Sequence, residues 1–200
     1  MKFPIFPLNG AVLFTKTNLP LNIFEERYLD MVDYSLSSNR FIGMIQTRED
    51  GSLYDIGCLG KIVGFNETSD NRYLINLFGN SYFRVIKEID SKHKFRIVDA
   101  EILKIKEVDN KDFLKNKFKA NIINTYRDYV KNNNIEINLK EIESIEDLEL
   151  KAKFITMISP FTTQEKQALL EKYELNSFYE TLISILKLYS SGQKDTLSIN

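Results

Sequence analysis

The fold follows from the stretch "CLGKIVGFNETSDNRYLINLF", residues Cys58–Phe78, in which two apolar runs of strand length flank a polar segment. The side chains of "NETSDN" favour the local hydrogen bonds of a turn, so we expect the two runs to pair as a hairpin. Apolar and polar residues alternate in the second run, which predicts a strand with one buried face. The buried face is assigned Tyr73, Ile75 and Leu77, and the opposite face Arg72, Asn76 and their neighbours.

Other segments of strand length surround this hairpin. "RFIGMIQ" (Arg40–Gln46) precedes it, and "YFRVIKEI" (Tyr82–Ile89) and "KFRIVDAEIL" (Lys94–Leu103) follow it as two further strands. Gly79 is expected to permit a bend or bulge between the hairpin and the first of these. Three glycines crowd the first strand of the hairpin and predict the tight curvature of a small barrel. They are Gly57, Gly60 and Gly64.

Apolar residues recur with the spacing of a helix in one segment before the expected sheet and throughout the part of the chain that follows it. Residues Phe24–Ser37 are expected to form a helix, and the spacing beyond Val108 predicts one long helix over about 109–131. The apolar stripe expected to pack against the later helices comprises Phe113, Phe118, Ile122 and Tyr126.

Three shorter helices are expected to follow, each marked by a hydroxyl residue three positions before an acid. The pairs are Ser144 with Asp147, Thr162 with Glu165, and Ser177 with Glu180. The last helix has an apolar stripe of its own, formed by Phe178, Leu182, Ile185 and Tyr189. The sequence therefore predicts an α+β chain: a β-rich subdomain over residues 1–107, a helical bundle over 108–190 and a flexible tail over 191–200.

Composition bounds the possible functions. The chain has 200 residues, is 43% hydrophobic and carries a formal net charge of −1, so no overall field attracts it to nucleic acid or anionic lipid. One cysteine, Cys58, and one histidine, His93, exclude an intramolecular disulfide and leave too few ligands for a zinc site. With no long apolar run, we expect a soluble cytoplasmic protein.

We find no sequence signature of an enzyme. The two glycine-rich motifs that bind nucleotide phosphates, G-x-x-x-x-G-K-[ST] and G-x-G-x-x-G, do not occur. Cys58 lies in an apolar strand and His93 in a charged turn, so we expect the two to lie apart. The carboxylate pairs Glu25–Glu26 and Glu141 with Glu143 are expected to be solvated surface groups. The sequence therefore predicts no catalytic residue, no cofactor and no metal.

Two segments suggest binding instead. Asn110–Lys131 contains six basic and two acidic residues, which favours contact with RNA phosphates, while Glu136–Lys151 has six acids against two bases. Residues 1–14 are rich in apolar side chains interrupted by prolines. They are typical of an edge or barrel strand, and alternatively of a groove that receives extended peptides.

The order of these segments resembles the LON N-terminal domain family, the substrate-binding region of ATP-dependent Lon proteases, over about residues 3–190. The matching stretches are "FPLNGAVLF", "LPLNIFEERY", "RFIGMIQ", "YDIGCLGKIVGF", "YLINLFGNSYFRV" and "ISPFTTQEKQALLE". The resemblance implies a PUA-like pseudo-barrel followed by a helical bundle, without the ATPase and Ser-Lys protease modules of full Lon. The chain departs from the family at Phe14-Thr15-Lys16, where relatives have F-P-G, and at Tyr82, where they have arginine.

The resemblance implies a non-enzymatic protein-binding module. Its expected partners are apolar or unfolded polypeptide segments, with Lon protease or another protein as a partner if it acts as an adaptor. The alternative is an RNA-binding PUA-like protein, although nucleic acid is the less expected partner. The candidate peptide-binding residues are Leu13, Phe14, Leu19, Phe24, Glu26 and Arg27.

Overall fold

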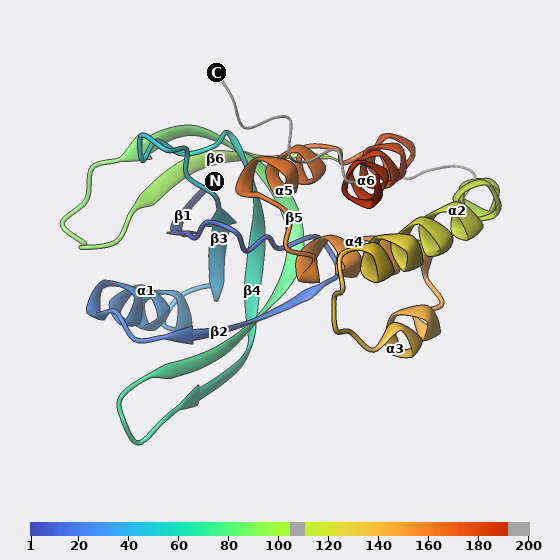
Figure 1. Cartoon of the computed structure of the whole chain (residues 1–200). Coiled ribbons are helices and arrows are strands. Elements are labelled where there is room, and N and C mark those ends of the chain that lie inside the picture. The colour runs from blue at the N-terminus through green and yellow to red at the C-terminus, as the bar shows by residue number, and fades with distance from the viewer. Residues whose placement is uncertain (105–110, 192–200) are drawn as a thin grey trace. The chain divides into compact units, whose positions relative to one another are not determined.

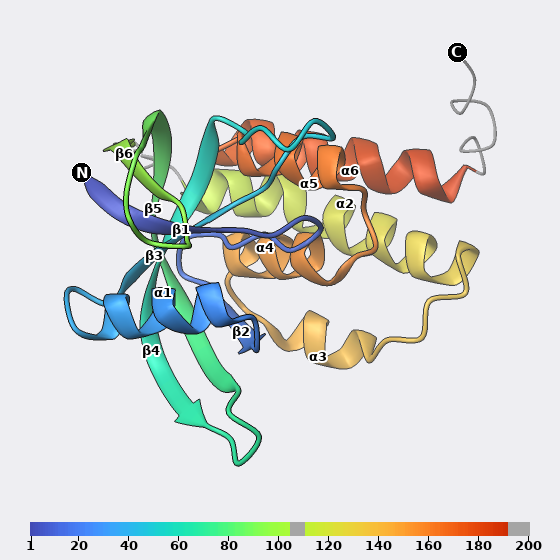
Figure 2. The same ribbon diagram turned by 90° about the vertical axis from the view of Figure 1, so that its left-hand side faces the viewer.

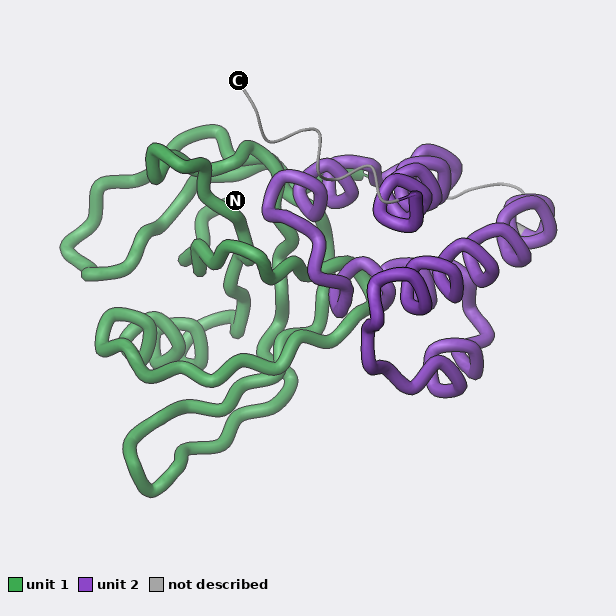
Figure 3. The backbone as a smooth tube through the Cα atoms, viewed as in Figure 1, with its two compact units in different colours: residues 1–104 green, residues 105–200 purple. Residues whose placement is uncertain are grey.

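The computed structural model describes residues 1–104 and 111–191. The chain divides into two compact units, Met1–Lys104 and Ile105–Asn200 (Figure 3). The expected boundary between Glu107 and Val108 lies outside the described residues, and so do residues 192–200 of the expected tail.

Unit 1 consists of a curled sheet and one helix (Figure 1). Its elements are β1 (Lys2–Pro7), β2 (Asn18–Ile23), α1 (Glu26–Leu36), β3 (Phe41–Ile45), β4 (Ile56–Glu67), β5 (Tyr73–Ile89) and β6 (Ile97–Ile102). The strand order is β2-β5-β4-β3-β1-β6, and β6 also pairs with β5. Strands β5, β4, β3, β1 and β6 therefore close into a ring to which β2 is attached. Only the β1–β3 pair is parallel among the described pairings, so the predicted, mostly antiparallel barrel is confirmed.

The inside of the barrel holds a compact apolar cluster. Phe3 and Phe83 meet edge to face with ring centroids 5.0 Å apart. A Cβ on Gly57 would lie 2.5 Å from both the Met44 carbonyl oxygen and the Phe83 ring, so only glycine lets the wall approach this closely. The β4–β5 pairing has two register shifts, one with its extra residue in β5 at Leu59/Gly60 and one with its extra residue in β4 at Ile62/Gly64, as expected for strands that must bend.

The β4–β5 hairpin is confirmed, and its tip extends away from the barrel in two views (Figures 1 and 2). The Thr68 amide donates to the Arg72 carbonyl over 2.9 Å at the turn. Ile75 and Leu77 are buried as the alternation predicts. The two runs on either side of Gly79 form one strand, β5. Its register with β4 shifts next to this glycine, where Leu59 pairs with Ser81 and Gly60 with Gly79, so the expected bulge is confirmed.

Gly79 also holds the loop between β1 and β2 against β5. Its amide donates to the Thr17 carbonyl over 2.9 Å, and its carbonyl accepts from the Lys16 amide over 2.8 Å. A Cβ on Gly79 would lie only 1.9 Å from the Phe14 carbonyl oxygen. Two stretches of backbone therefore touch at this position with no room for a side chain.

Lys16 in this loop has a backbone φ of 67°, in the left-handed region that disfavours residues with a Cβ. The resemblance places a glycine here in relatives. We expect Lys16→Gly to stabilise the chain by about 1 kcal/mol, because removing the side chain relieves the left-handed strain. Urea denaturation followed by tyrosine fluorescence measures the change. A loss of stability would show that the lysine side chain contributes more than its backbone conformation costs.

Helix α1 is shorter than predicted. It begins at Glu26 after the N-cap Glu25, so Phe24 lies before the helix rather than on its apolar stripe. The buried side of α1 carries Tyr28, Met31, Val32 and Ser35. The helix contacts β1 and β3, and the Tyr28 ring lies 4.4 Å from the Phe6 ring between centroids. One side of the barrel is thereby covered.

Unit 2 consists of helices. They are α2 (Lys111–Asn132), α3 (Leu139–Ser144), α4 (Leu148–Ile158), α5 (Thr163–Leu170) and α6 (Leu175–Ser190). Helix α2 packs against α6 and α4, so the expected packing of the long helix is confirmed for two of the later helices. Figure 2 shows α2, α4 and α6 running alongside one another. None of the helices in 1–104 and 111–191 is long and apolar enough to cross a membrane.

The predicted apolar stripe of α2 is correct except for its first residue. Phe118, Ile122 and Tyr126 are buried, but Phe113 is 61% exposed and Leu114 takes its place. Leu114 lies four residues before Phe118 and eight before Ile122, which puts all three on one helix face. Phe113 is rotated off that face by one residue, so its assignment to the packing stripe is wrong.

The predicted helix starts are correct in one case of three. Thr162 and Glu165 form a reciprocal capping box at α5, with bonds of 3.2 and 2.7 Å. Ser144 instead ends α3, a helix that the sequence did not predict, and its hydroxyl donates to the Glu141 carbonyl. The cap of α4 is Asp147, whose carboxylate accepts from the Leu150 amide over 3.1 Å.

The predicted start at Ser177 is wrong. Helix α6 begins two residues earlier, at Leu175, after the N-cap Glu174, which makes no side-chain capping bond. The first turn is held by apolar burial, since Phe178 and Tyr179 are both buried. Of the predicted stripe, Phe178 and Leu182 are buried, whereas Ile185 and Tyr189 are only half-buried.

Candidate functional site

Two of the expected peptide-binding residues are unavailable at the surface. Leu13 and Phe14 are each 1% exposed, so the expectation of exposure is wrong for both. The Leu13 side chain lies against Gly60, where an added Cβ would be 2.8 Å from it. The Thr17 hydroxyl donates to the Phe14 carbonyl over 2.8 Å. Their loop folds inward against the sheet, and its apolar side chains belong to the core.

The remaining expected residues separate into three positions. Leu19 is half-buried and lies opposite Leu77, on the covered face of the sheet. Phe24 is 64% exposed and lies just after β2. Glu26 and Arg27 are exposed in the first turn of α1. The structure therefore does not gather all six into one site.

An exposed apolar surface does lie around Phe24. In the register of β2 with β5, Asn22 is opposite Leu74 and Asn18 is opposite Phe78, so these residues share the face away from Leu77. Leu74 is 42% and Phe78 37% exposed. We call this surface the outer apolar face and define it as Pro20, Phe24, Leu74 and Phe78.

Phe24 is tied to this face through Arg72. The Arg72 guanidinium carbon lies 5.7 Å from the centre of the Phe24 ring, and Arg72 precedes Leu74 by two residues, on the same side of the strand. Asp70 holds the guanidinium with an ion pair of 2.8 Å. The outer apolar face therefore has a charged rim at the hairpin end.

Sequence reasoning missed Leu74 and Phe78. The alternation in "YLINLF" correctly places Ile75 and Leu77 inside and therefore assigns their neighbours to solvent. Leu74 and Phe78 are large apolar residues on the side assigned to solvent, and this feature of the sequence could have indicated the site. Clustered apolar side chains on such a side mark interaction surfaces more often than isolated ones do.

Strand β2 gives the outer apolar face an edge. It is terminal in the strand order and pairs with β5 in the described sheet. Pro20, which has no N–H, sits in its middle, as is typical of an edge strand. The Asn76 side-chain amide donates to the Asn18 side-chain oxygen over 3.2 Å, so polar amides lie among the apolar side chains.

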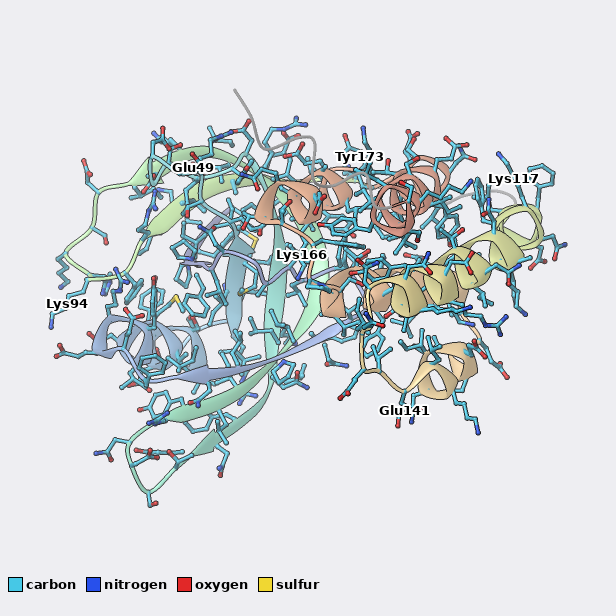
Figure 4. All side chains as sticks on the ribbon, in the orientation of Figure 1. Glu49, Lys94, Lys117, Glu141, Lys166 and Tyr173 are labelled. Atoms are coloured by element: carbon cyan, nitrogen blue, oxygen red, sulfur yellow. The ribbon has the colours of Figure 1, made fainter. Side chains whose placement is uncertain are left out.

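A cationic pocket of about 230 Å³ lies in the same unit, between α1 and the segment just before β6. Its walls include Arg27, Tyr28, Thr47, Lys94, Phe95 and Arg96. Figure 4 labels Lys94, which projects from the loop between β5 and β6. The sequence predicted Arg27 as a binding residue. It gave no sign that Lys94, Phe95 and Arg96 would lie beside Arg27, because contacts between distant segments are set by the tertiary fold.

Each cation of the pocket has an acidic partner. Arg27 pairs with Glu25 at 2.8 Å and Lys94 with Glu26 at 3.0 Å. Arg96 binds Glu88 through two guanidinium nitrogens. These bonds hold the pKa of the Glu88 carboxyl below its usual value and raise the pKa of Arg96. Burial raises the pKa of the Tyr28 phenol, an effect that the Arg27 charge opposes.

Cys58 and His93 occupy different environments. Cys58 is buried in the barrel wall, in register with Met44 and Tyr82. The His93 ring stacks on Phe95 with centroids 4.7 Å apart. Within the described ranges, no cluster of three or more histidine, cysteine or acidic side chains is placed to hold a metal.

Exposed bases of α2 are partly matched by acids. Lys117, labelled in Figure 4, lies 3.6 Å from Glu180, and Arg127 lies 2.7 Å from Glu143. The acid-rich segment after α2 therefore supplies a partner to the basic helix within the same unit. These pairs lower the positive potential that phosphate binding would use.

The fold is thus a closed barrel with an exposed apolar sheet face, followed by a helical bundle. The family described as "ATP-dependent protease La (LON) substrate-binding domain" matches residues 2–187. This chain belongs to that family.

Similar proteins agree with this assignment. The chain is 26% identical to a Lon protease of Desulfosudis oleivorans and 21% identical to one of Buchnera aphidicola. The matches cover 96% and 94% of this chain but 25% of each relative, so the chain spans about a quarter of their length.

Two solved structures show the same fold. One is titled as the N-terminal domain of Mycobacterium avium complex Lon protease, with a TM-score of 0.68 at 12% identity over 96% of this chain and 98% of that chain. The other is a Lon N-terminal domain protein from Xanthomonas campestris, with a TM-score of 0.65 at 16% identity over 92% and 98%.

Proposed function

We propose that this chain binds exposed apolar or unfolded polypeptide segments through the outer apolar face. The observation that carries the proposal is the grouping of Phe24, Leu74 and Phe78 on the solvent side of a sheet. Full burial of a large apolar side chain contributes roughly 1.5–3 kcal/mol, so covering this surface with a ligand supplies binding free energy. Family membership supports a role in substrate recognition.

The surface suits an extended chain. An extended segment presents side chains to both sides and backbone groups along its length, and a sheet edge such as β2 can receive those backbone groups. Exposed Asn18, which Asn76 holds through a side-chain hydrogen bond, adds an amide that can donate to a peptide carbonyl. Recognition of this kind selects apolar, unfolded chain without demanding a particular sequence.

We propose that the role is binding and not catalysis. The relatives are named Lon proteases, and this chain corresponds to about a quarter of their length. The chain would present polypeptide to a Lon-type protease, or act as an adaptor for another protein, in the cytoplasm. Leu13 and Phe14 support the surface from within instead of contacting the ligand.

A double variant tests the proposal. We expect Phe24→Ser with Leu74→Ser to weaken binding of a reduced, alkylated unfolded polypeptide at least about tenfold, since 1.4 kcal/mol is tenfold and two apolar contacts are lost. Fluorescence anisotropy of the labelled polypeptide measures the affinity. The matched control is Phe113→Ser, which removes an equally exposed aromatic side chain from unit 2.

The two variants separate the possible outcomes. Normal affinity in the control and reduced affinity in the double variant support the outer apolar face. Equal affinity in all three proteins contradicts it. If the protein binds labelled RNA and not the unfolded polypeptide, and if the affinity for RNA falls steeply with added salt, the RNA-binding alternative is favoured.

A further inference from the structure

The cationic pocket beside α1 is lined by three basic side chains whose acidic partners are not among its lining residues. Arg27, Lys94 and Arg96 line it, and no carboxylate is among the described residues of its wall. The three cations come from segments far apart in sequence, the first turn of α1 and the approach to β6. Convergent positive groups around a concave space attract an oxyanion more strongly than the same groups spread over a flat surface.

The acidic partners stand outside the wall of the pocket and can be exchanged. Glu25 and Glu26 are exposed, and exposed ion pairs contribute little to stability because water screens them. An entering anion can therefore replace Glu25 at Arg27 and Glu26 at Lys94 at little cost. Glu88 is different, since its two bonds orient the Arg96 guanidinium. A guanidinium has five N–H donors, so three remain beyond the two that Glu88 receives.

The volume of the pocket and its aromatic lining residues limit the kinds of ligand that fit. A volume of about 230 Å³ is below the roughly 300–1,000 Å³ of pockets that hold a whole cofactor or drug-sized molecule. Tyr28 and Phe95 are largely buried and give the pocket an aromatic side. The space accommodates a single oxyanion together with one apolar group.

We propose that this pocket binds the C-terminal carboxylate of a polypeptide whose last side chain is apolar. The proposal rests on the proposed function, because it assumes that polypeptide is the ligand of this unit. The carboxylate lies between Arg27, Lys94 and Arg96, and the last side chain lies against Tyr28 and Phe95. The pocket thereby adds a preference for chain ends to the sequence-tolerant outer apolar face.

Peptides that differ only at their end test this inference. The full chain is titrated with a labelled apolar decapeptide that has a free C-terminal carboxylate and with the same peptide as its C-terminal amide. We expect the acid to bind about tenfold more tightly, because hydrogen bonds to a charged group are each worth roughly one tenfold step or more. The advantage should shrink as salt is added, since partly exposed charges are screened.

Variants assign the effect to the pocket. Arg27→Gln with Lys94→Gln should abolish the advantage of the acid, while Lys87→Gln with Lys92→Gln, an equal change of charge at exposed positions outside the wall, should preserve it. Equal affinity for acid and amide in the unchanged protein overturns the inference. If the unfolded polypeptide still binds in that case, the proposed function stands without the pocket.

Competition with inorganic phosphate tests whether the pocket binds a free anion or the C-terminal carboxylate of a polypeptide. We expect phosphate to compete weakly, because it fills the charged part of the pocket but not the aromatic side. Phosphate that binds as tightly as the peptide acid, and loses affinity in the Arg27→Gln, Lys94→Gln protein, would assign the pocket to a free anion and overturn the polypeptide source.

Discussion

Replacing Phe118 with alanine is expected to destabilise unit 2 by about 3–5 kcal/mol, the cost of truncating a buried aromatic residue. Phe118 is 4% exposed, and its ring lies 5.4 Å from the Tyr179 ring of α6, between centroids. The truncation removes this contact at the α2–α6 packing and leaves a cavity. Because a whole domain is typically stable by about 5–15 kcal/mol, the bundle becomes marginal.

Circular dichroism melts measure the effect. The helical signal of Phe118→Ala should be lost at a lower temperature, while the barrel, whose apolar cluster is internal to unit 1, remains folded. Phe113→Ala is the matched control, since it removes the same side chain from an exposed position on the same helix and should change stability by no more than about 0.5 kcal/mol. Equal melts for the two variants would show that α2 does not form the core of the bundle.

Replacing Gly79 with alanine is expected to destabilise unit 1 by about 3 kcal/mol, at the upper end of the range for overpacking. The new methyl group would lie 1.9 Å from the Phe14 carbonyl oxygen and 2.7 Å from its carbon. These are backbone atoms, so no side-chain rotation relieves the contact. The loop must move away from β5 and break its hydrogen bonds with Gly79.

Gly64→Ala is the control for this change. Gly64 also lies in the sheet, but an added Cβ there meets nothing closer than 3.4 Å, an ordinary contact. We expect its stability to be unchanged or raised by up to about 1 kcal/mol, through the reduced freedom of the unfolded chain. Urea denaturation followed by tyrosine fluorescence distinguishes the two. Similar losses in both variants would mean that the loop is not held at Gly79.

Much of the fold can be predicted because it is encoded locally. The alternation around Ile75, the turn in "NETSDN" and the Thr162–Glu165 spacing each specify structure within a few residues, and all three are confirmed. The errors at the helix starts have two causes. Ser144 and Ser177 have the spacing of a cap, but α4 starts at the competing cap Asp147. Helix α6 starts after Glu174, which makes no side-chain capping bond, and its beginning is held by apolar burial.

The candidate site was less predictable than the fold. Leu13 and Phe14 resemble exposed groove residues in sequence, and only the folding of their loop onto β5 buries them. Leu74 and Phe78 belong to an exposed surface because the residues opposite them on β2 are Asn22 and Asn18, polar side chains on the same face of the sheet. The cationic pocket depends on residues separated by most of unit 1. Periodicity describes one element at a time, so it does not report which elements meet.

Amide hydrogen exchange on the full chain, with and without a reduced, alkylated unfolded polypeptide, tests the central claim most directly. Binding at the outer apolar face should slow exchange in residues 18–24 and 72–78, where ligand covers the edge of β2 and the face of β5. Exchange in α2 of unit 2 should be unchanged. Slowed exchange confined to α2, or none at β2 and β5 under saturating polypeptide, would contradict the account.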